Sequence, residues 1–265
     1  MKILFWNTYR NKNINNYVLK LVEKYDVDIL LLAEYKGNLE DLDSLLIYSN
    51  QKLERCNTVG CNRIEMWSNL INIDPGIQND YYSIQIINNQ LIICGVHLFS
   101  NLNGNKDDER LEKIKEIKSD INTLVKNRSS NKVIIIGDFN EMPYGKGCLN
   151  ANGFHGLPIL NDNDKITRKV HGTEYAKYYN PMWNFFGDFN YPPGTYYYSN
   201  SSSLYSPMWY IFDQVLISKE VIPFFRKESL EIITKGLANK NGHPNKKISD
   251  HFPIVLEIKE EILYG

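Results

Sequence analysis

The sequence KVIIIGDFN at residues 132–140 joins a run of apolar residues to a polar ending. The run Val133–Ile136 predicts a strand that is buried on both of its faces. Asp138 and Asn140 follow directly, so polar side chains stand where this strand ends. Upstream, Asp107–Lys126 carries an apolar stripe at helical spacing, which predicts a helix with one buried face. A helix next to a buried strand indicates a fold of mixed α and β structure.

The same combination of a buried strand and a polar ending recurs along the chain. Five further strands carry a polar residue at or next to one end: Lys2–Trp6 with Asn7, Asp28–Ala33 with Glu34, Leu91–Val96 with His97, Ile211–Ile217 with Asp213, and Phe252–Ile258 with Asp250 and His251. Strand ends at one edge of a sheet can converge, so we expect these side chains to gather. Carboxylate and amide oxygens suit Mg²⁺ or Mn²⁺, and histidines add proton donors. The set predicts metal-assisted hydrolysis of a phosphate ester.

The remaining elements alternate between helix and strand. Periodicity predicts helices at Ile14–Tyr25 and Leu39–Ile47 and further strands at Arg63–Trp67, Tyr81–Ile87 and Leu230–Ile233. Asn88 and Asn89 predict a hairpin turn, because Asn tolerates positive φ. No linker rich in Pro, Gly or Ser divides the chain. The sequence therefore predicts a single α+β or α/β domain over residues 1–265.

Composition and charge exclude several classes of protein. Hydrophobic residues make up 43% and charged residues 23%, as in an ordinary folded domain. The net charge of −1 excludes a uniformly basic nucleic-acid coat but leaves a local basic groove open. The apolar runs are shorter than the roughly 20 residues of a membrane helix. The N-terminal residues turn polar too early for a signal peptide, so we expect a cytoplasmic protein.

The four cysteines do not form a pattern typical of a disulfide framework. Cys56 and Cys61 have no second Cys or His pair at the spacing of a zinc site. We therefore expect reduced thiols.

Six ordered segments carry a resemblance to a known family. They are Phe5–Asn7, Leu31–Glu34, Gly95–Leu98, Ile136–Asn140, Ile211–Val215 and Ser249–Pro253. In this order they resemble the endonuclease/exonuclease/phosphatase superfamily, which includes deoxyribonuclease I and the abasic-site endonucleases. The resemblance implies a four-layer α/β/β/α sandwich in which helices flank two packed, mostly antiparallel sheets. It also implies an active site at one edge of the strands.

The resemblance implies a metal site built on Glu34. This residue would be the principal Mg²⁺ (or Mn²⁺) carboxylate, with Asn7 and Asp250 close to the metal or its waters. The alternatives are that Glu34 caps a turn and that Asn7 is a simple turn residue. Because Mg²⁺ keeps several water ligands, few protein ligands are sufficient to bind it.

Asp138 and Asn140 would act on the water and the phosphate. By resemblance, Asp138 orients or deprotonates the attacking water and Asn140 holds the phosphate. The alternative is an Asx turn without a catalytic role. Whether Asp138 or a histidine is the base stays open in the sequence.

Two histidines complete the implied site. His251 resembles the histidine that contacts the scissile phosphate, and Asp213 resembles its carboxylate partner, which favours the protonated ring. His97 resembles a second histidine of the deoxyribonuclease I branch; it would protonate the leaving oxygen, with Glu65 as a candidate partner. Arg110 resembles an arginine that contacts phosphate, and the alternative is a solvated helix end.

Other regions of the sequence bear on the substrate. Residues Tyr175–Phe212 are dense in aromatic side chains, which either stack on bases or pack over the sheet edge. Gly187–Asn190 repeats the residues of Gly137–Asn140, but it lies between loop residues, so we expect a turn there. The remaining histidines, His155, His171 and His243, have no motif context and are expected at the surface.

The sequence thus predicts a Mg²⁺- or Mn²⁺-dependent phosphodiesterase that cleaves nucleic acid, DNA or RNA, by direct attack of water. A second hypothesis keeps the chemistry and changes the substrate to an inositol phosphate, a sphingolipid head group or a small nucleotide, because a fold does not determine a substrate. A third hypothesis is an inactive binding module. It predicts a missing acid or histidine, and none is missing.

Overall fold

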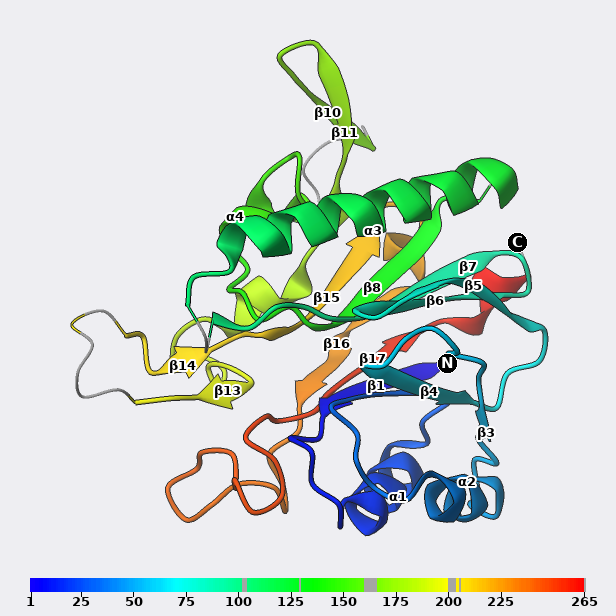
Figure 1. Ribbon diagram of the computed structural model, residues 1–265, viewed down its shortest axis with the longest axis vertical. Coiled ribbons are helices and arrows are strands. Elements are labelled where there is room, and N and C mark those ends of the chain that lie inside the picture. The colour runs from blue at the N-terminus through cyan, green and yellow to red at the C-terminus, as the bar shows by residue number, and fades with distance from the viewer. Residues whose placement is uncertain (102–103, 129, 160–165, 200–203, 205, 265) are drawn as a thin grey trace.

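The structure, a computed structural model, describes residues 1–101, 104–128, 130–159, 166–199, 204 and 206–264 (Figure 1). Two large mixed sheets form its centre, and most of their strand pairs are antiparallel. None of the helices in these ranges is long and apolar enough to cross a membrane.

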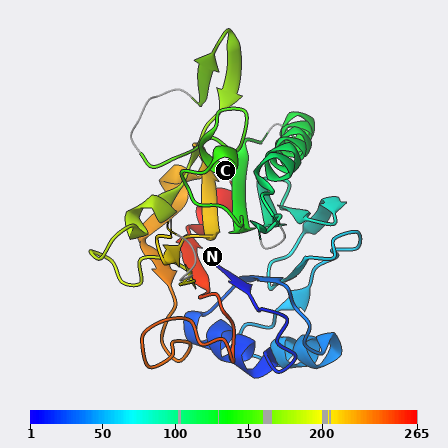
Figure 2. The same ribbon diagram turned by 60° about the vertical axis from the view of Figure 1, so that its left-hand side comes forward.

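The first sheet has six strands in the order β16-β17-β1-β2-β4-β3. Their bounds are β1 Lys2–Asn7, β2 Ile29–Ala33, β3 Glu54–Arg55, β4 Ile64–Ser68, β16 Phe225–Ile232 and β17 Ile254–Ile258. Helices α1 (Asn15–Tyr25) and α2 (Leu39–Ile47) cover its outer face (Figures 1 and 2). The α1 side chains predicted to form one apolar face, such as Val18 and Val22, are buried in this layer.

The second sheet has seven strands in the order β5-β6-β7-β8-β15-β12-β9. Their bounds are β5 Ile73–Asn79, β6 Tyr82–Ile87, β7 Leu91–His97, β8 Lys132–Asp138, β9 Gly156–Leu157, β12 Tyr178–Tyr179 and β15 Asp213–Ser218. Helices α3 (Asp107–Arg128) and α4 (Lys146–Leu149) lie on its outer side (Figure 1). The smaller elements are the hairpins β10 (Thr167–Val170) with β11 (Thr173–Ala176) and β13 (Tyr196–Tyr197) with β14 (Trp209–Tyr210), and the 3-10 helices η2 (Pro181–Phe185), η3 (Ile222–Phe224) and η4 (Glu260–Leu263).

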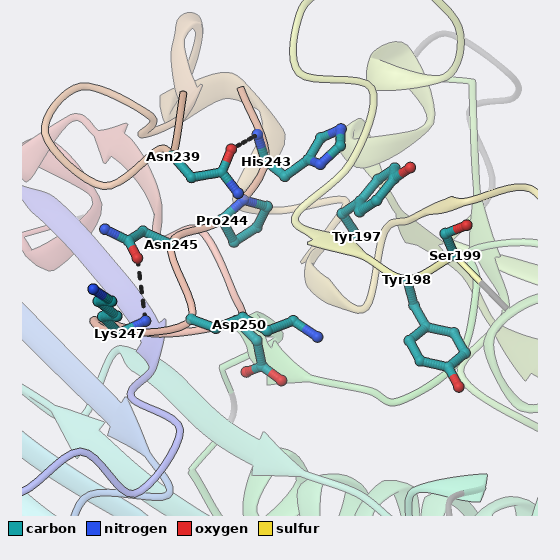
Figure 3. Close-up of a pocket in the computed structure, with 10 residues that line it drawn as sticks. Tyr197, Tyr198, Ser199, Asn239, His243, Pro244, Asn245, Lys247 and Asp250 are labelled. Atoms are coloured by element: carbon teal, nitrogen blue, oxygen red, sulfur yellow. Dashed lines mark hydrogen bonds between the residues drawn. The ribbon is translucent and has the colours of Figure 1, made fainter. Parts of the chain in front are cut away.

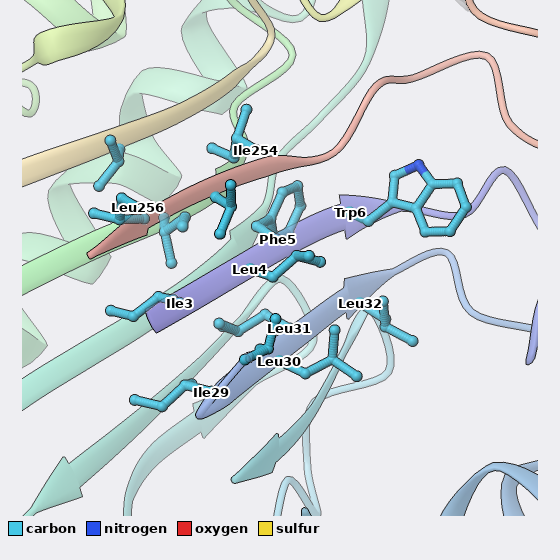
Figure 4. Close-up of a cluster of buried hydrophobic side chains, with 14 of the residues drawn as sticks. Ile3, Leu4, Phe5, Trp6, Ile29, Leu30, Leu31, Leu32, Ile254 and Leu256 are labelled. Carbon is cyan, nitrogen blue, oxygen red and sulfur yellow. The ribbon is translucent and has the colours of Figure 1, made fainter. Parts of the chain in front are cut away.

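Strand β8 shows why four layers form. Successive side chains of a strand point to opposite faces. Ile134 and Ile136 pack in the core that also contains the first sheet, whereas Val133 and Ile135 pack in the core beneath α3. Figure 4 shows the first of these cores around β1, β2 and β17. A strand that is apolar on both faces needs a cover on each, so the predicted α/β/β/α sandwich is confirmed.

Most predicted elements lie within a few residues of their expected positions, and the exceptions have physical causes. Strand β15 begins at Asp213, because Phe212 lies before the ladder and its carbonyl oxygen accepts the Phe139 amide at 2.8 Å. Strand β5 was missed because it contains Pro75 and Gly76, and its register shifts after Pro75. The aromatic segment 175–212, expected as loops, includes the short strands β12, β13 and β14. All four cysteines are free thiols, as expected.

Candidate active site

The registers of three strand pairs bring the predicted residues to one end of the two sheets. In the first sheet Asn7 lies opposite Ala33, the residue before Glu34. In the second sheet His97 and Asp213 both lie opposite Asp138, on the two neighbouring strands of β8. Parallel strands end on the same side, and an antiparallel strand begins there. The gathering expected from the strand ends is therefore confirmed within each sheet.

His251 and Asp213 form the shortest contact between ionisable side chains at this site. His251 Nδ1 lies 2.7 Å from Asp213 Oδ2, and both side chains are buried. Burial alone would lower the pKa of His251, but the carboxylates of Asp213 and Asp138 act against it and raise this pKa to about 10. The imidazole is therefore a cation at neutral pH, with its Nε2 directed toward Asp138 and Asp250 at 3.9 Å each. A buried cation beside a phosphate would stabilise negative charge that develops there.

Asp138 lies between the two histidines and is held by hydrogen bonds on both oxygens. Asn7 Nδ2 donates to Asp138 Oδ2 at 2.8 Å, and the backbone amide of Asn140 donates to Asp138 Oδ1 at 2.8 Å. His97 Nε2 and His251 Nε2 are each 3.9 Å from Oδ2. Burial raises the pKa of Asp138, with the charge of His251 acting in the opposite direction. A fixed carboxylate with a raised pKa is suited to accept a proton from water.

Asn140 makes the predicted Asx turn with Asp138 and one further bond. Its Nδ2 donates to the Leu98 carbonyl oxygen at 3.1 Å, which links the end of β8 to the residue after His97. Its backbone has a φ of 49°, a left-handed conformation that Asn tolerates better than most residues. The turn and a contact to phosphate are compatible, because the turn uses only the backbone amide of Asn140.

Glu34 lies near the same His97 nitrogen, Nε2, as Asp138. His97 Nε2 is 3.5 Å from Glu34 Oε1, and Arg10 Nε is 3.0 Å from Glu34 Oε2. Burial lowers the pKa of His97 to about 4, although Asp138 acts in the opposite direction. The ring is neutral at neutral pH in this environment, so it acts as a hydrogen-bond donor. The candidate pairing of Glu65 with His97 is wrong, since Glu65 accepts the Thr58 hydroxyl at 3.3 Å instead.

The unsatisfied groups of the site indicate where a cation would bind. Asp250 Oδ1 is buried without a hydrogen-bond partner among the described residues. Burial raises the pKa of Asp250 to about 6, opposed by His251, and the charge of Glu34 adds to the rise. Arg10, the partner of Glu34, is 73% exposed and can leave. Asp250 has an oxygen without a hydrogen bond and Glu34 pairs with an exposed arginine, so the two carboxylates are donors suited to Mg²⁺ or Mn²⁺.

A second arrangement of acidic groups and histidine is present at the same site. Asp138, Asp213 and His251 offer ligand atoms that all lie within 4.8 Å of one another. This cluster is compatible with a cation, but hydrogen bonds already use many of its ligand atoms. His251 Nδ1 bonds to Asp213, and Asp138 accepts bonds from Asn7 and Asn140. Glu34 and Asp250 retain more free oxygen valences. The donor set therefore favours Glu34 and Asp250 as metal ligands. Asn7 Oδ1 already accepts the Tyr9 amide at 3.0 Å.

Several residues that support the site were not singled out from the sequence. Tyr196 packs its ring against His251 with centroids 4.9 Å apart. Thr195 Oγ1 accepts the Asp213 amide at 3.1 Å, and Ser249 Oγ donates to the Asn7 carbonyl oxygen at 2.7 Å. Ser249 stood inside the Ser-Asp-His segment, and Thr195 and Tyr196 stood in the aromatic region. Nothing in their local pattern separates them from their neighbours.

The prediction for Arg110 needs correction. Its side chain is only 1% exposed, so it is not a solvated helix end. Its guanidinium donates to the Phe99 carbonyl oxygen at 3.0 Å, to Asp107 at 2.9 Å and to Asn101 at 2.7 Å. These bonds tie the segment after His97 to the first turn of α3. Arg110 therefore has a structural task, and its donors are not available to substrate phosphate.

The isolated histidines and the repeated tetrapeptide also have definite places. His155 was expected at the surface but is fully buried, with Nδ1 at 3.1 Å from the Ala176 carbonyl oxygen. His171 is exposed, and His243 is half-buried against Tyr197. Gly187–Asn190 forms an exposed turn as predicted.

The fold of this chain also occurs in known proteins. The chain has the four-layer fold of the endonuclease/exonuclease/phosphatase superfamily, also called deoxyribonuclease I-like, as the sequence predicted. No protein-family model matches the chain, and no curated protein matches it by sequence.

Solved structures of two kinds are similar to it. One is the 3′ phosphatase NExo from Neisseria bound to a product DNA hairpin, with 16% identity, a TM-score of 0.58, and 98% of this chain and 99% of that chain covered. A structure of the 3′-5′ exonuclease NExo from Neisseria meningitidis gives 15% identity, a TM-score of 0.58, and coverage of 98% and 100%. The catalytic domain of human Nocturnin with a bound sulfate anion gives 13%, 0.59, and 97% and 93%. At these identities the likeness concerns the fold.

Proposed function

We propose that this protein is a divalent-metal-dependent phosphodiesterase that hydrolyses a phosphodiester bond of DNA or RNA by direct attack of water. The observation that supports the proposal is the unbroken series of side-chain contacts that runs from Glu34 through Asp138 to Asp213, each at most 3.9 Å long. The series joins three carboxylates, a cationic imidazole and a neutral one within one site. An inactive binding module would not need this set.

Glu34 and Asp250, with Asn7 beside them, would hold Mg²⁺ or Mn²⁺. When bound, the ion would supply Lewis-acid stabilisation of the phosphoryl oxygens. Metal ligation by these residues and the choice of ion are part of the proposal.

The side chains around the metal site divide the remaining work. Asp138, oriented by Asn7 and by the Asn140 amide, accepts the proton of the attacking water. Protonated His251, oriented by Asp213, stabilises negative charge on the phosphate. His97 donates its N–H to a phosphate oxygen, and Asn140 supports the same group. Each role follows from the bonds that fix the side chain and leave one face free.

A nucleic-acid substrate is favoured by the aromatic residues next to the site. Tyr196 of β13 contacts His251, and the rings of Tyr210 in β14 and of Phe212 lie against Tyr196. Exposed rings can stack on bases of any identity. The similar NExo structure that contains a DNA hairpin supports the same substrate class. A cytoplasmic location stays a prediction.

The test is a screen of the purified protein with Mg²⁺ or Mn²⁺, and with a chelator, against DNA, RNA, phosphoinositide and sphingomyelin. We expect hydrolysis of a polynucleotide that the chelator abolishes. Glu34→Gln should lower kcat/KM about 10³-fold, since the ion contributes several kcal/mol. It should also weaken Mn²⁺ binding in calorimetry.

Glu54→Gln, on the exposed strand β3, is the matched control and should change neither activity nor metal binding. Hydrolysis of phosphoinositide or sphingomyelin alone would contradict the nucleic-acid substrate. If the protein hydrolyses none of the four substrates, the proposed phosphodiesterase activity is contradicted.

A further inference from the structure

A pocket of about 480 Å³ adjoins the candidate active site and shares Asp250 with it (Figure 3). One side of the pocket comes from Tyr197 and Tyr198, at the end of β13, and the other from the segment 239–247 that precedes β17. This volume lies within the range of about 300–1,000 Å³ that is usual for a site binding a small molecule. A ligand in the pocket would therefore lie directly beside the candidate metal carboxylate.

The two sides of the pocket meet in an aromatic contact. The rings of Tyr197 and His243 stack with centroids 3.5 Å apart and planes 13° from parallel. Trp209 packs edge-on against both rings, at 5.2 Å and 5.6 Å. Tyr198, by contrast, is 43% exposed, and in the view of Figure 3 its ring and the Asp250 carboxylate both point downward, away from the stacked pair. Tyr198 thus presents an exposed ring at a pocket that Asp250 also lines.

The side of the pocket formed by the segment 239–247 is held in place by two asparagines. Asn239 Oδ1 accepts the backbone amides of Asn241 and His243 at 2.8 Å and 3.2 Å. Asn245 Oδ1 accepts the Lys247 amide at 3.2 Å, and its carbonyl oxygen accepts the Ile248 amide at 2.7 Å. These bonds fix the loop without a ligand. The pocket is therefore preformed, which lowers the entropic cost of binding.

The charge of the pocket favours an anion at its rim. Lys246 and Lys247 are exposed and line it, and no ion pair to either ammonium group is found in the described part of the chain. Among the described residues that line the pocket, Asp250 is the only acidic one, and it is shared with the active site. A suitable ligand combines a flat ring for Tyr198 with a phosphate for the lysines.

We propose that this pocket holds one nucleotide of a single-stranded polynucleotide, adjacent to the scissile phosphate, with its base on Tyr198 and its outer phosphate beside Lys246 and Lys247. This inference rests on the proposed function and adds to it a site for a flanking residue of the substrate. Because stacking is tolerant of base identity, the pocket positions the strand without reading its sequence. A phosphorylated polyol would satisfy the lysines but leave the aromatic face without a partner.

The test scans a single-stranded oligonucleotide in which one residue lacks its base, placed in turn at each position around the cleaved bond. For the wild-type protein we expect one position, next to that bond, at which loss of the base lowers kcat/KM about tenfold. Tyr198→Ala should cut the intact strand about tenfold more slowly than the wild type. Loss of a base should not lower its kcat/KM further at any position. Tyr198→Phe, which keeps the ring, should behave as the wild type. A merely structural role of Tyr198 would leave the position-dependent loss in place.

Tyr48→Ala, an exposed tyrosine after α2, is the matched control and should keep the wild-type profile. For the lysines, the salt dependence of oligonucleotide binding is measured by fluorescence anisotropy with chelator present. Replacing Lys246 and Lys247 together by Ala should reduce the slope of log K against log salt by about 1.4, and Lys240→Ala, outside the pocket, should leave it unchanged.

Two results would overturn the proposed nucleotide site while leaving the proposed function intact. One is cleavage by the wild type whose kcat/KM does not depend on which position lacks its base. The other is a Tyr198→Ala variant with the same position dependence as the wild type. Failure of the wild-type protein to cut any polynucleotide would instead overturn the proposed function.

Discussion

The tetrapeptide Gly-Asp-Phe-Asn occurs twice in this chain, at residues 137–140 and 187–190, in opposite environments. Asp138 is 1% exposed at the end of β8, whereas Phe189 of the second copy is 96% exposed in a turn. The first copy follows four apolar residues that lie in the second sheet, and the second follows Phe185 and Phe186 at the end of η2. The difference shows that the chemistry of these residues depends on the strand that delivers them.

The neighbours of β8 explain the contrast. Strand β7 places His97 opposite Asp138 on one side, and β15 places Asp213 opposite it on the other. The carboxylate of the first copy therefore meets ionisable partners in a buried site. Asp188 is exposed, and within its copy Asn190 Nδ2 donates a local bond to the Asn184 carbonyl oxygen at 2.9 Å. The two copies thus form a matched set for mutagenesis within one chain.

The largest contrast is expected in activity. Asp138→Asn removes a proton acceptor and keeps its size, so we expect kcat/KM to fall by about 10²–10⁴-fold, the range of general base catalysis. Asp188→Asn should retain wild-type activity. Steady-state kinetics on the best substrate of the screen measures both. Equal activity of the two variants would contradict a catalytic role for Asp138.

The thermal stability of the same two variants sharpens the comparison. Because burial raises the pKa of Asp138, its charged form is disfavoured in the fold, and Asn at this position should not lower the melting temperature. An activity loss that merely follows unfolding would contradict the catalytic interpretation.

The positions of the strand ends, and with them part of the candidate site, could be predicted from the sequence. Apolar runs end where strands end, so Asn7, His97 and Asp138 could be placed at one end of their strands. The sandwich could be inferred from the order of six short segments. The gathering of these residues needed only strand ends, and it is confirmed, while their individual roles stay predictions.

The partners of long side chains could not be predicted in the same way. Glu34 rather than Glu65 lies next to His97, and Arg110 turns inward to the segment after His97. Such choices depend on rotamers and on packing between elements distant in sequence, which periodicity does not describe. The pocket beside Asp250 was missed for the same reason, since Tyr198 and Lys246 are far apart in the chain.

The next contrast concerns stability. Phe139 is fully buried beneath α3 and packs edge-on against Phe154 at 5.3 Å. Phe139→Ala should lower the free energy of unfolding by about 3–5 kcal/mol, and Phe189→Ala should change it by less than about 0.5 kcal/mol. Urea unfolding gives both values. A loss for Phe189→Ala as large as that for Phe139→Ala would show that the exposed turn packs on another surface in solution.

The smallest contrast is expected at the two glycines. A Cβ at Gly137 would collide with the Val96 carbonyl oxygen of β7, so Gly137→Ala should push β8 away from β7 and cost about 1–3 kcal/mol. Nothing lies within 4 Å of a Cβ at Gly187, but its φ of 82° is left-handed, so Gly187→Ala should cost about 1 kcal/mol.

Activity separates the two glycine variants more sharply than stability does. Val96 and Gly137 directly precede His97 and Asp138, so a shift of β8 changes the distance between the two side chains of the site. Gly137→Ala should therefore have a lower kcat/KM than the wild type at temperatures where the variant is still folded. Gly187→Ala should keep the wild-type value. Full activity of folded Gly137→Ala would mean that the site tolerates movement of β8, and the close approach of β7 and β8 would then matter for stability alone.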